Sequence, residues 1–149
     1  MNHWTPSRSL KLTRLLNIAT IFLGVAALFC IPICTEWYDA VSGQEPIRNL
    51  LNVIFYLTVF LALIALWKLN GLLSRIIHQQ IFVSENVTVL RIISWCCFGI
   101  SALFLFLTFY RFLAFIVAFA AGFFGLIMRV LKNVFELAVN LREEQDFTI

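Results

Sequence analysis

The stretch IISWCCFGISALFLFLTFYRFLAFIVAFAAGFFGLIM, residues 92–128, contains one charged side chain, Arg111. As a single helix it would be about 55 Å long at 1.5 Å per residue, nearly twice the roughly 30 Å hydrocarbon core of a bilayer. A lone charge in the middle of a bilayer is also costly. We therefore expect a turn at Tyr110–Arg111, with two membrane-spanning helices over residues 92–109 and 112–128.

Two further charge-free runs precede this stretch, at residues 15–34 and 50–67. The whole chain is 62% hydrophobic and only 13% charged, whereas a soluble domain is about half apolar and about a quarter charged. A chain of 149 residues cannot hide so much apolar surface from water. The sequence therefore predicts one all-α membrane domain, residues 1–149, with four transmembrane helices in a bundle.

The number of lysine and arginine residues alternates from one connecting segment to the next. Three lie before the first run and one lies between the first two runs. Three more lie in residues 68–91, the next is Arg111, and three follow residue 128. Connections rich in Lys and Arg remain in the cytoplasm. We therefore expect both termini and the segment 68–91 on the cytoplasmic side.

Amphipathic sequence continues beyond the second and fourth runs. After the second run, apolar residues recur at helical spacing, namely Leu69, Leu72, Leu73, Ile76 and Ile77. After the fourth run, one helical face holds Leu131, Val134, Phe135, Ala138 and Leu141. We expect cytoplasmic helical extensions over residues 68–78 and 129–145 that pack against each other.

Local signals add detail to these extensions. Lys132 and Glu136 form an i,i+4 pair of opposite charge. Ser84 is expected to be the N-cap of the third helix, with Glu85 favourably placed in its first turn. His78, at the end of the first extension, is expected to be solvated or to cap the helix.

Small residues in the fourth span permit close helix packing. Ala114, Ala118 and Gly122 share one register, and Ala121 and Gly125 share another. Spacing of this kind lets helix backbones approach each other in a membrane. The favoured interpretation is packing within one bundle, and formation of a homodimer is the alternative.

No residue set predicts catalysis, a metal site or a cofactor site. Four cysteines, Cys30, Cys34, Cys96 and Cys97, have no His or second Cys pair at the same predicted depth, so we interpret them as small apolar residues. The spans also lack the intramembrane charges on which ion-coupled carriers depend. Their scattered polar residues are expected to hydrogen-bond between helices: Asn17, Thr20, Asn52, Thr58, Ser94, Ser101 and Thr108. We expect no enzymatic activity and no cofactor.

The C-terminal segment is polar but ends in two apolar residues around a threonine. An acidic stretch that closes on an apolar tip suits a docking element for a basic, grooved protein. The alternative is a solvated helix end whose tip folds back onto the extensions. The candidate partner-docking residues are Arg142, Glu143, Glu144, Asp146, Phe147 and Ile149.

Two segments resemble a known family. Ile81-Phe82-Val83-Ser84-Glu85-Asn86-Val87 with Leu90-Arg91-Ile92 is similar to the stretch before the third span of the bacterial membrane family catalogued as domain of unknown function 2975. Residues 134–138 and 141–149 resemble the C-terminal signature of that family. The resemblance implies a four-helix protein of the bacterial cytoplasmic membrane, and genes of this family often lie beside one for a small helix-turn-helix regulator of the Cro/CI type.

These observations favour a regulatory or scaffolding membrane protein that binds a cytoplasmic partner. The resemblance makes a helix-turn-helix regulator the candidate partner, with no direct contact between this chain and nucleic acid. Two alternatives stay open: a small oligomeric channel or transporter, and an immunity or envelope-stress protein.

Overall fold

Four long helices make up most of the structure, a computed structural model that describes residues 6–147. The helices are α1 (Pro6–Ser42), α2 (Arg48–Ile77), α3 (Ser84–Thr108) and α4 (Ala114–Phe147). Each is long and apolar enough to cross a membrane. The predicted all-α class with four candidate spans is confirmed, and the turn expected at Tyr110–Arg111 separates α3 from α4.

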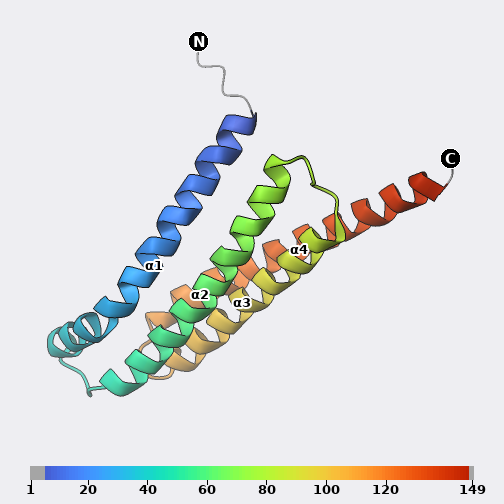
Figure 1. The fold of residues 1–149 in the computed structure, drawn as a ribbon. Coiled ribbons are helices and arrows are strands. Elements are labelled where there is room, and N and C mark those ends of the chain that lie inside the picture. The colour runs from blue at the N-terminus through green and yellow to red at the C-terminus, as the bar shows by residue number, and fades with distance from the viewer. Residues whose placement is uncertain (1–5, 148–149) are drawn as a thin grey trace, which may run out of the picture.

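The helices run in alternating directions, so their connections gather at two ends of the molecule (Figure 1). The start of α1, the end of α4 and the α2–α3 connection lie at one end, which we call the terminal end. The α1–α2 loop and the α3–α4 turn lie at the opposite end, which we call the far end.

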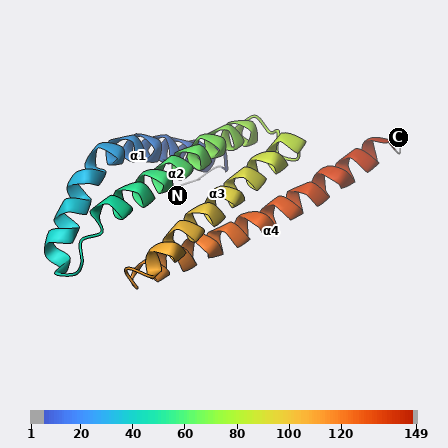
Figure 2. The same ribbon diagram turned by 90° about the horizontal axis from the view of Figure 1, so that it is seen from below.

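Each helix packs against the next helix in the chain, α1 on α2, α2 on α3 and α3 on α4. Within residues 6–147, the backbones of α1 and α4 make no close approach to each other. The helices therefore form a curved row whose first and last members stay apart (Figure 2). The apolar segment of α3, which packs against α2 and α4, has the largest buried share of the four.

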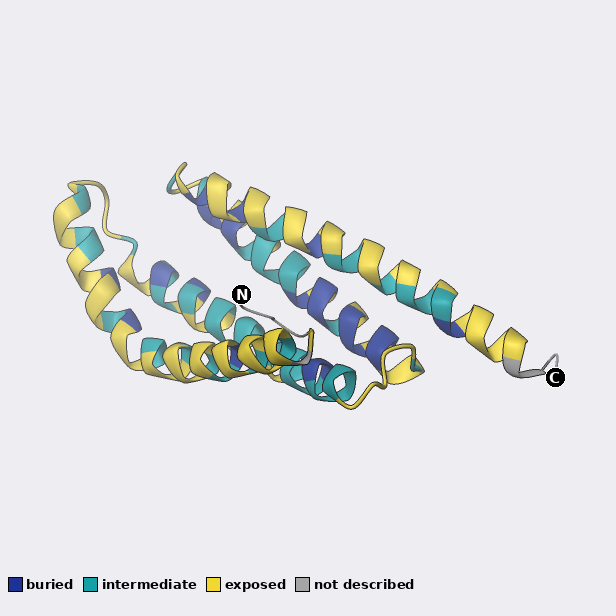
Figure 3. Ribbon diagram, turned by 90° about the horizontal axis from the view of Figure 1, so that it is seen from above, coloured by how far each residue is buried: buried dark blue, intermediate teal, exposed yellow. Residues whose placement is uncertain are grey.

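Large apolar side chains cover the outer surface of this row. Phe22 is 70% exposed, Phe109 87% and Phe119 68%. Figure 3 shows exposed positions running along the outward sides of α1 and α4. In water an apolar surface this extensive would drive association with other molecules, whereas lipid is a suitable solvent for it.

α1 continues beyond the run of residues 15–34 and ends at Ser42. Pro32 lies inside it, where it removes one helical hydrogen bond and favours a kink. The helix bends on its way to the far end (Figure 2). Gly43 follows with φ +60°, a left-handed conformation that glycine adopts at little cost. The loop to α2 covers residues 43–47.

Some of the polar residues that were expected to hydrogen-bond between helices do so. Asn17 on α1 donates a 3.1 Å hydrogen bond to the carbonyl of Leu66 on α2. Thr35, which is buried, donates from its hydroxyl to Oδ1 of Asn52 at 2.6 Å. The hydroxyl of Ser101 also bonds to a neighbouring helix, whereas those of Thr20, Ser94 and Thr108 bond to carbonyls of their own helix.

The small residues of α4 face α3. Ala118 is 1% exposed, and its carbonyl accepts a 2.7 Å hydrogen bond from the hydroxyl of Ser101. A Cβ added at Gly122 would lie 3.1 Å from the Ser101 hydroxyl, and one added at Gly125 would lie 2.9 Å from the ring of Phe98. These residues therefore allow α3 and α4 to pack closely within one chain.

Two clusters of buried apolar side chains form the core. The far-end cluster consists of Leu51, Ile54, Phe104, Leu107, Ala114 and Ala118. The terminal-end cluster consists of Leu72, Val89, Leu90 and Ile93. Both clusters include residues of α2 and α3, which are the central pair of the row.

The prediction that Ser84 is the N-cap of α3 is wrong. The helix begins at Ser84, and its N-cap is Val83, which makes no side-chain capping bond. Glu85 does lie in the first turn, with Oε2 3.7 Å from Nη1 of Arg75. The side chain of Asn86, in the same turn, donates hydrogen bonds to the carbonyls of Gln80 and Ile81 in the α2–α3 connection.

Candidate functional site

The α2–α3 connection at the terminal end is held by one side chain, that of Asn86. Asn86 has 0% of its surface exposed. Its Nδ2 donates to the carbonyls of Gln80, at 2.9 Å, and Ile81, at 2.7 Å. Its Oδ1 accepts a 2.6 Å hydrogen bond from Nε of Arg75 on α2. Asn86 therefore fixes the connection to the end of α2.

The end of α2 is capped at His78. The ring Nδ1 of His78 lies 2.8 Å from the carbonyl oxygen of Ser74, in agreement with the capping role expected for it. Gln79 follows with φ +62° and its N–H donates to the carbonyl of Ile76. His3 lies outside the described residues.

The two segments that carry the family resemblance meet at the terminal end. The rings of Phe82 and Phe135 lie edge to face, with their centroids 5.9 Å apart. Phe135 on α4 and Ile76 on α2 both pack against the terminal-end cluster. Within the described residues α2 and α4 make no close backbone approach, and both helices contact a cluster that belongs mostly to α3. The first turns of α3 supply apolar side chains to both.

Most of the large apolar side chains in residues 129–145 of α4 are exposed, whereas Val139 is buried. Lys132 Nζ and Glu136 Oε2 form the predicted ion pair at 2.8 Å. On the side away from α3, four large side chains are 38–62% exposed. We call them the α4 stripe: Leu131, Val134, Leu137 and Leu141.

The predicted docking residues follow the α4 stripe. Arg142, Glu143 and Glu144 are exposed on the last turns of α4, which Figure 1 shows projecting past the start of α3. The helix continues to Phe147. The side chains of Asp146 and Phe147, and all of Thr148 and Ile149, lie outside the described part of the chain.

The cysteines occupy two places in the fold. Cys30 and Cys34 are exposed on α1, Cys96 is buried on α3, and its neighbour Cys97 is half-buried. Across residues 6–147, no group of three or more His, Cys, Asp or Glu side chains lies close enough to hold a metal ion.

A largely buried ion pair at the far end was not predicted from the sequence. Nη2 of Arg111, in the α3–α4 turn, lies 3.9 Å from Oδ1 of Asp39 on α1, and the side chains are 10% and 11% exposed. Nη2 of Arg111 also donates a 2.8 Å hydrogen bond to the carbonyl of Glu45. The guanidinium lies 5.9 Å from the centre of the Tyr38 ring. The sequence features that could have indicated this pair are the single arginine, Arg111, in one connection and the acidic residues of segment 35–49 in another.

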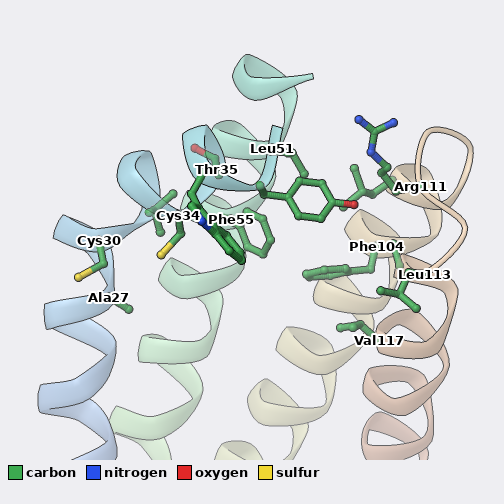
Figure 4. Close-up of a pocket in the computed structure, with 15 residues that line it drawn as sticks. Ala27, Cys30, Cys34, Thr35, Leu51, Phe55, Phe104, Arg111, Leu113 and Val117 are labelled. Atoms are coloured by element: carbon green, nitrogen blue, oxygen red, sulfur yellow. The ribbon is translucent and has the colours of Figure 1, made fainter. Parts of the chain in front are cut away.

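Beside this ion pair lies a cavity of about 470 Å³, which we call the far-end cavity. All four helices contribute to it, and Figure 4 shows side chains from opposite walls pointing into the space between them. The walls include Ala27, Cys30, Ile31, Cys34, Thr35, Trp37, Tyr38, Leu51, Phe55, Phe104, Leu107, Leu113, Ala114 and Val117, with Arg111 at one end. Its chemistry suits the binding of an apolar group more than a reaction.

Four apolar helices with their connections at two opposite ends define the class of a multi-pass α-helical membrane protein. Within that class the chain belongs to the family described as "Protein of unknown function (DUF2975)", whose profile matches residues 16–149. The expected family membership is thereby confirmed over nearly the whole chain. Searches of curated proteins and of solved structures find no match to it.

Proposed function

We propose that this chain is a regulatory or scaffolding protein of the bacterial cytoplasmic membrane that binds a cytoplasmic protein through the α4 extension. In this proposal both termini are cytoplasmic. The connections with three basic residues each belong to the terminal end, whereas Arg48 and Arg111 belong to the far end. The positive-inside rule supports a cytoplasmic terminal end on this distribution.

The proposal includes amphipathic extensions of α2 and α4 beyond the bilayer. At 1.5 Å per residue, the 34 residues of α4 extend about 51 Å, and a hydrocarbon core of roughly 30 Å covers about 20 of them. Trp95 supports a membrane–water boundary near Arg129, because its side chain is 62% exposed and the guanidinium of Arg129 lies 5.2 Å from the centre of its ring. In this proposal the row of four helices lies in lipid, and the two extensions form a cytoplasmic stub.

The α4 stripe is the observation that carries the proposal. It lies beyond the charge-free part of α4, where the proposal places water or another protein around it. Apolar side chains recurring at helical spacing are a recognised mode of docking into a groove of a partner. Glu143, Glu144 and Asp146 follow the stripe and favour a basic partner.

A small helix-turn-helix regulator fits this chemistry, since DNA-binding proteins carry basic surfaces. Binding at the membrane would hold such a regulator away from its targets. The proposed role is not enzymatic and uses no cofactor, and any contact with nucleic acid belongs to the partner.

The test compares a double charge substitution in the α4 stripe with a single charge substitution outside it on the same helix. Leu137→Glu with Leu141→Glu places charge in the α4 stripe, whereas Asn140→Glu adds charge at an exposed position outside it. After affinity purification from membranes, wild type and Asn140→Glu should each retain one soluble protein, in an amount nearly equal to that of the membrane protein itself. The stripe variant, and a truncation that removes residues 143–149, should lose it by about tenfold or more.

Retention of every partner by the stripe variant would contradict the proposal. Membrane insertion of each variant is checked by extraction and size-exclusion profile, so that misfolding is distinguished from loss of docking. The same partner, purified, should bind the wild-type protein with an affinity that falls as salt rises.

A further inference from the structure

The far-end cavity occupies the place where a fourth helix–helix interface would complete a bundle. α1 and α4 both line it, yet within residues 6–147 their backbones make no close approach. Its volume of about 470 Å³ lies within the roughly 300–1,000 Å³ of small-molecule sites. Apolar side chains such as Ile31, Phe55 and Val117 form its walls. A single hydrocarbon chain would therefore gain contacts with both helices.

The cavity has one charged end. Among the described residues that line it, Arg111 is the one that carries a full charge. Figure 4 shows its aliphatic part beside the apolar walls and its guanidinium pointing away from them, toward the rim. An amphiphile with its tail among the apolar side chains would place its head at this rim.

The guanidinium of Arg111 is incompletely satisfied. Its distance of 3.9 Å to Asp39 is long beside the roughly 2.7–2.9 Å of a hydrogen-bonded ion pair. Nε of Arg111 and both carboxylate oxygens of Asp39 are buried and find no hydrogen-bond partner within residues 6–147. A buried donor without a partner is costly, and a planar carboxylate is the acceptor that matches the guanidinium best.

We propose that the far-end cavity binds a long-chain fatty acid, with its hydrocarbon chain between α1 and α4 and its carboxylate at Arg111. One acyl chain suits the volume of the cavity, and the carboxylate supplies an acceptor for Nε. The fatty acid provides the missing contact between the first and last helices of the row. Binding at this end is independent of the cytoplasmic partner proposed for the α4 stripe.

The test uses Trp37, which lines the cavity, as a reporter. Trp4, Trp67 and Trp95 are replaced by phenylalanine, and the protein is purified in an uncharged maltoside detergent. Dibromostearate, a quenching fatty acid, is titrated beside its uncharged methyl ester at a pH where the acid is ionised. We expect saturable quenching by the acid and about tenfold weaker binding of the ester.

Substitutions separate the roles of the charge and the cavity. Arg111→Gln should weaken binding of the acid about tenfold and leave the ester unchanged. Val117→Phe, at a half-exposed wall position, should fill space and weaken both probes. Arg8→Gln, an exposed arginine at the start of α1, is the matched control and should change neither.

Linear, unsaturable quenching of the wild-type protein would overturn the proposal, as would equal affinity for the acid and the ester. Displacement of dibromostearate by phosphatidylglycerol at lower concentration than by stearate would assign the cavity to a phospholipid instead. If Arg111→Gln fails to fold, Arg111→Lys retains the charge and should still prefer the acid. The comparison of acid with ester in Arg111→Lys then tests the role of the charge without the glutamine variant, and equal affinity for the two probes there would overturn the proposal.

Discussion

Replacing Asn86 by leucine is expected to lower the free energy of unfolding by about 4 kcal/mol. The substitution removes three hydrogen bonds from a fully buried side chain, those with Arg75, Gln80 and Ile81. Each buried partner left unsatisfied costs about 1–3 kcal/mol. Because Arg75 retains some contact with solvent, its share lies at the low end of that range.

The measurement is unfolding of the purified protein in mixed micelles with rising sodium dodecyl sulfate, followed by circular dichroism. Asn140→Leu is the matched control, because Asn140 is exposed on α4 and the same change there removes no buried bond. A loss below about 1 kcal/mol for Asn86→Leu would show that its hydrogen bonds do not hold the α2–α3 connection.

Replacing Gly125 by leucine is expected to cost about 3 kcal/mol. The new Cβ alone would lie 2.9 Å from the ring of Phe98 and 3.3 Å from Cβ of Cys97. The two helices must then separate, which also lengthens the hydrogen bond from Ser101 to the carbonyl of Ala118. The same unfolding titration measures the loss.

Gly71→Leu provides the comparison for this change. The nearest atoms to a Cβ at Gly71 belong to the guanidinium of Arg75 at 3.7 Å and beyond, which is ordinary contact. Leucine favours a helix over glycine by about 1 kcal/mol, so this variant should be unchanged or slightly more stable. Equal effects at Gly71 and Gly125 would mean that close packing of α3 on α4 does not contribute to stability.

The apolar runs were enough to predict the helices, because a segment in lipid must satisfy its own backbone hydrogen bonds. The turn at Arg111 followed from length and charge, and the role of small residues such as Gly122 followed from their spacing. The extension of α1 to Ser42 did not follow, because residues 35–42 include Glu36 and Asp39 and come after a proline. Burial of Thr35 and packing of Tyr38 on the far-end cluster account for it.

The order of packing could not be read from the sequence. Helices that are apolar on every side give little indication of which face meets which neighbour. The sequence predicted contact between α2 and α4 at the terminal end, whereas both helices contact a cluster that belongs mostly to α3 there. The pair of Asp39 and Arg111 joins residues far apart in the chain. Asn86 carried a resemblance to the family, but its three bonds depend on where the α2–α3 connection folds.

Both ends of the molecule can be assigned to a side of the membrane by cysteine labelling, which tests the four-span arrangement and its proposed orientation together. In a background without the four native cysteines, Gln44→Cys reports on the far end and Gln80→Cys on the terminal end. Both positions are exposed, and Gln80 avoids the left-handed backbone of Gln79. Gln44→Cys should react with a membrane-impermeant maleimide in intact cells, and Gln80→Cys should react only after permeabilisation. Labelling of Gln80→Cys in intact cells, or protection of Gln44→Cys there, would contradict the account.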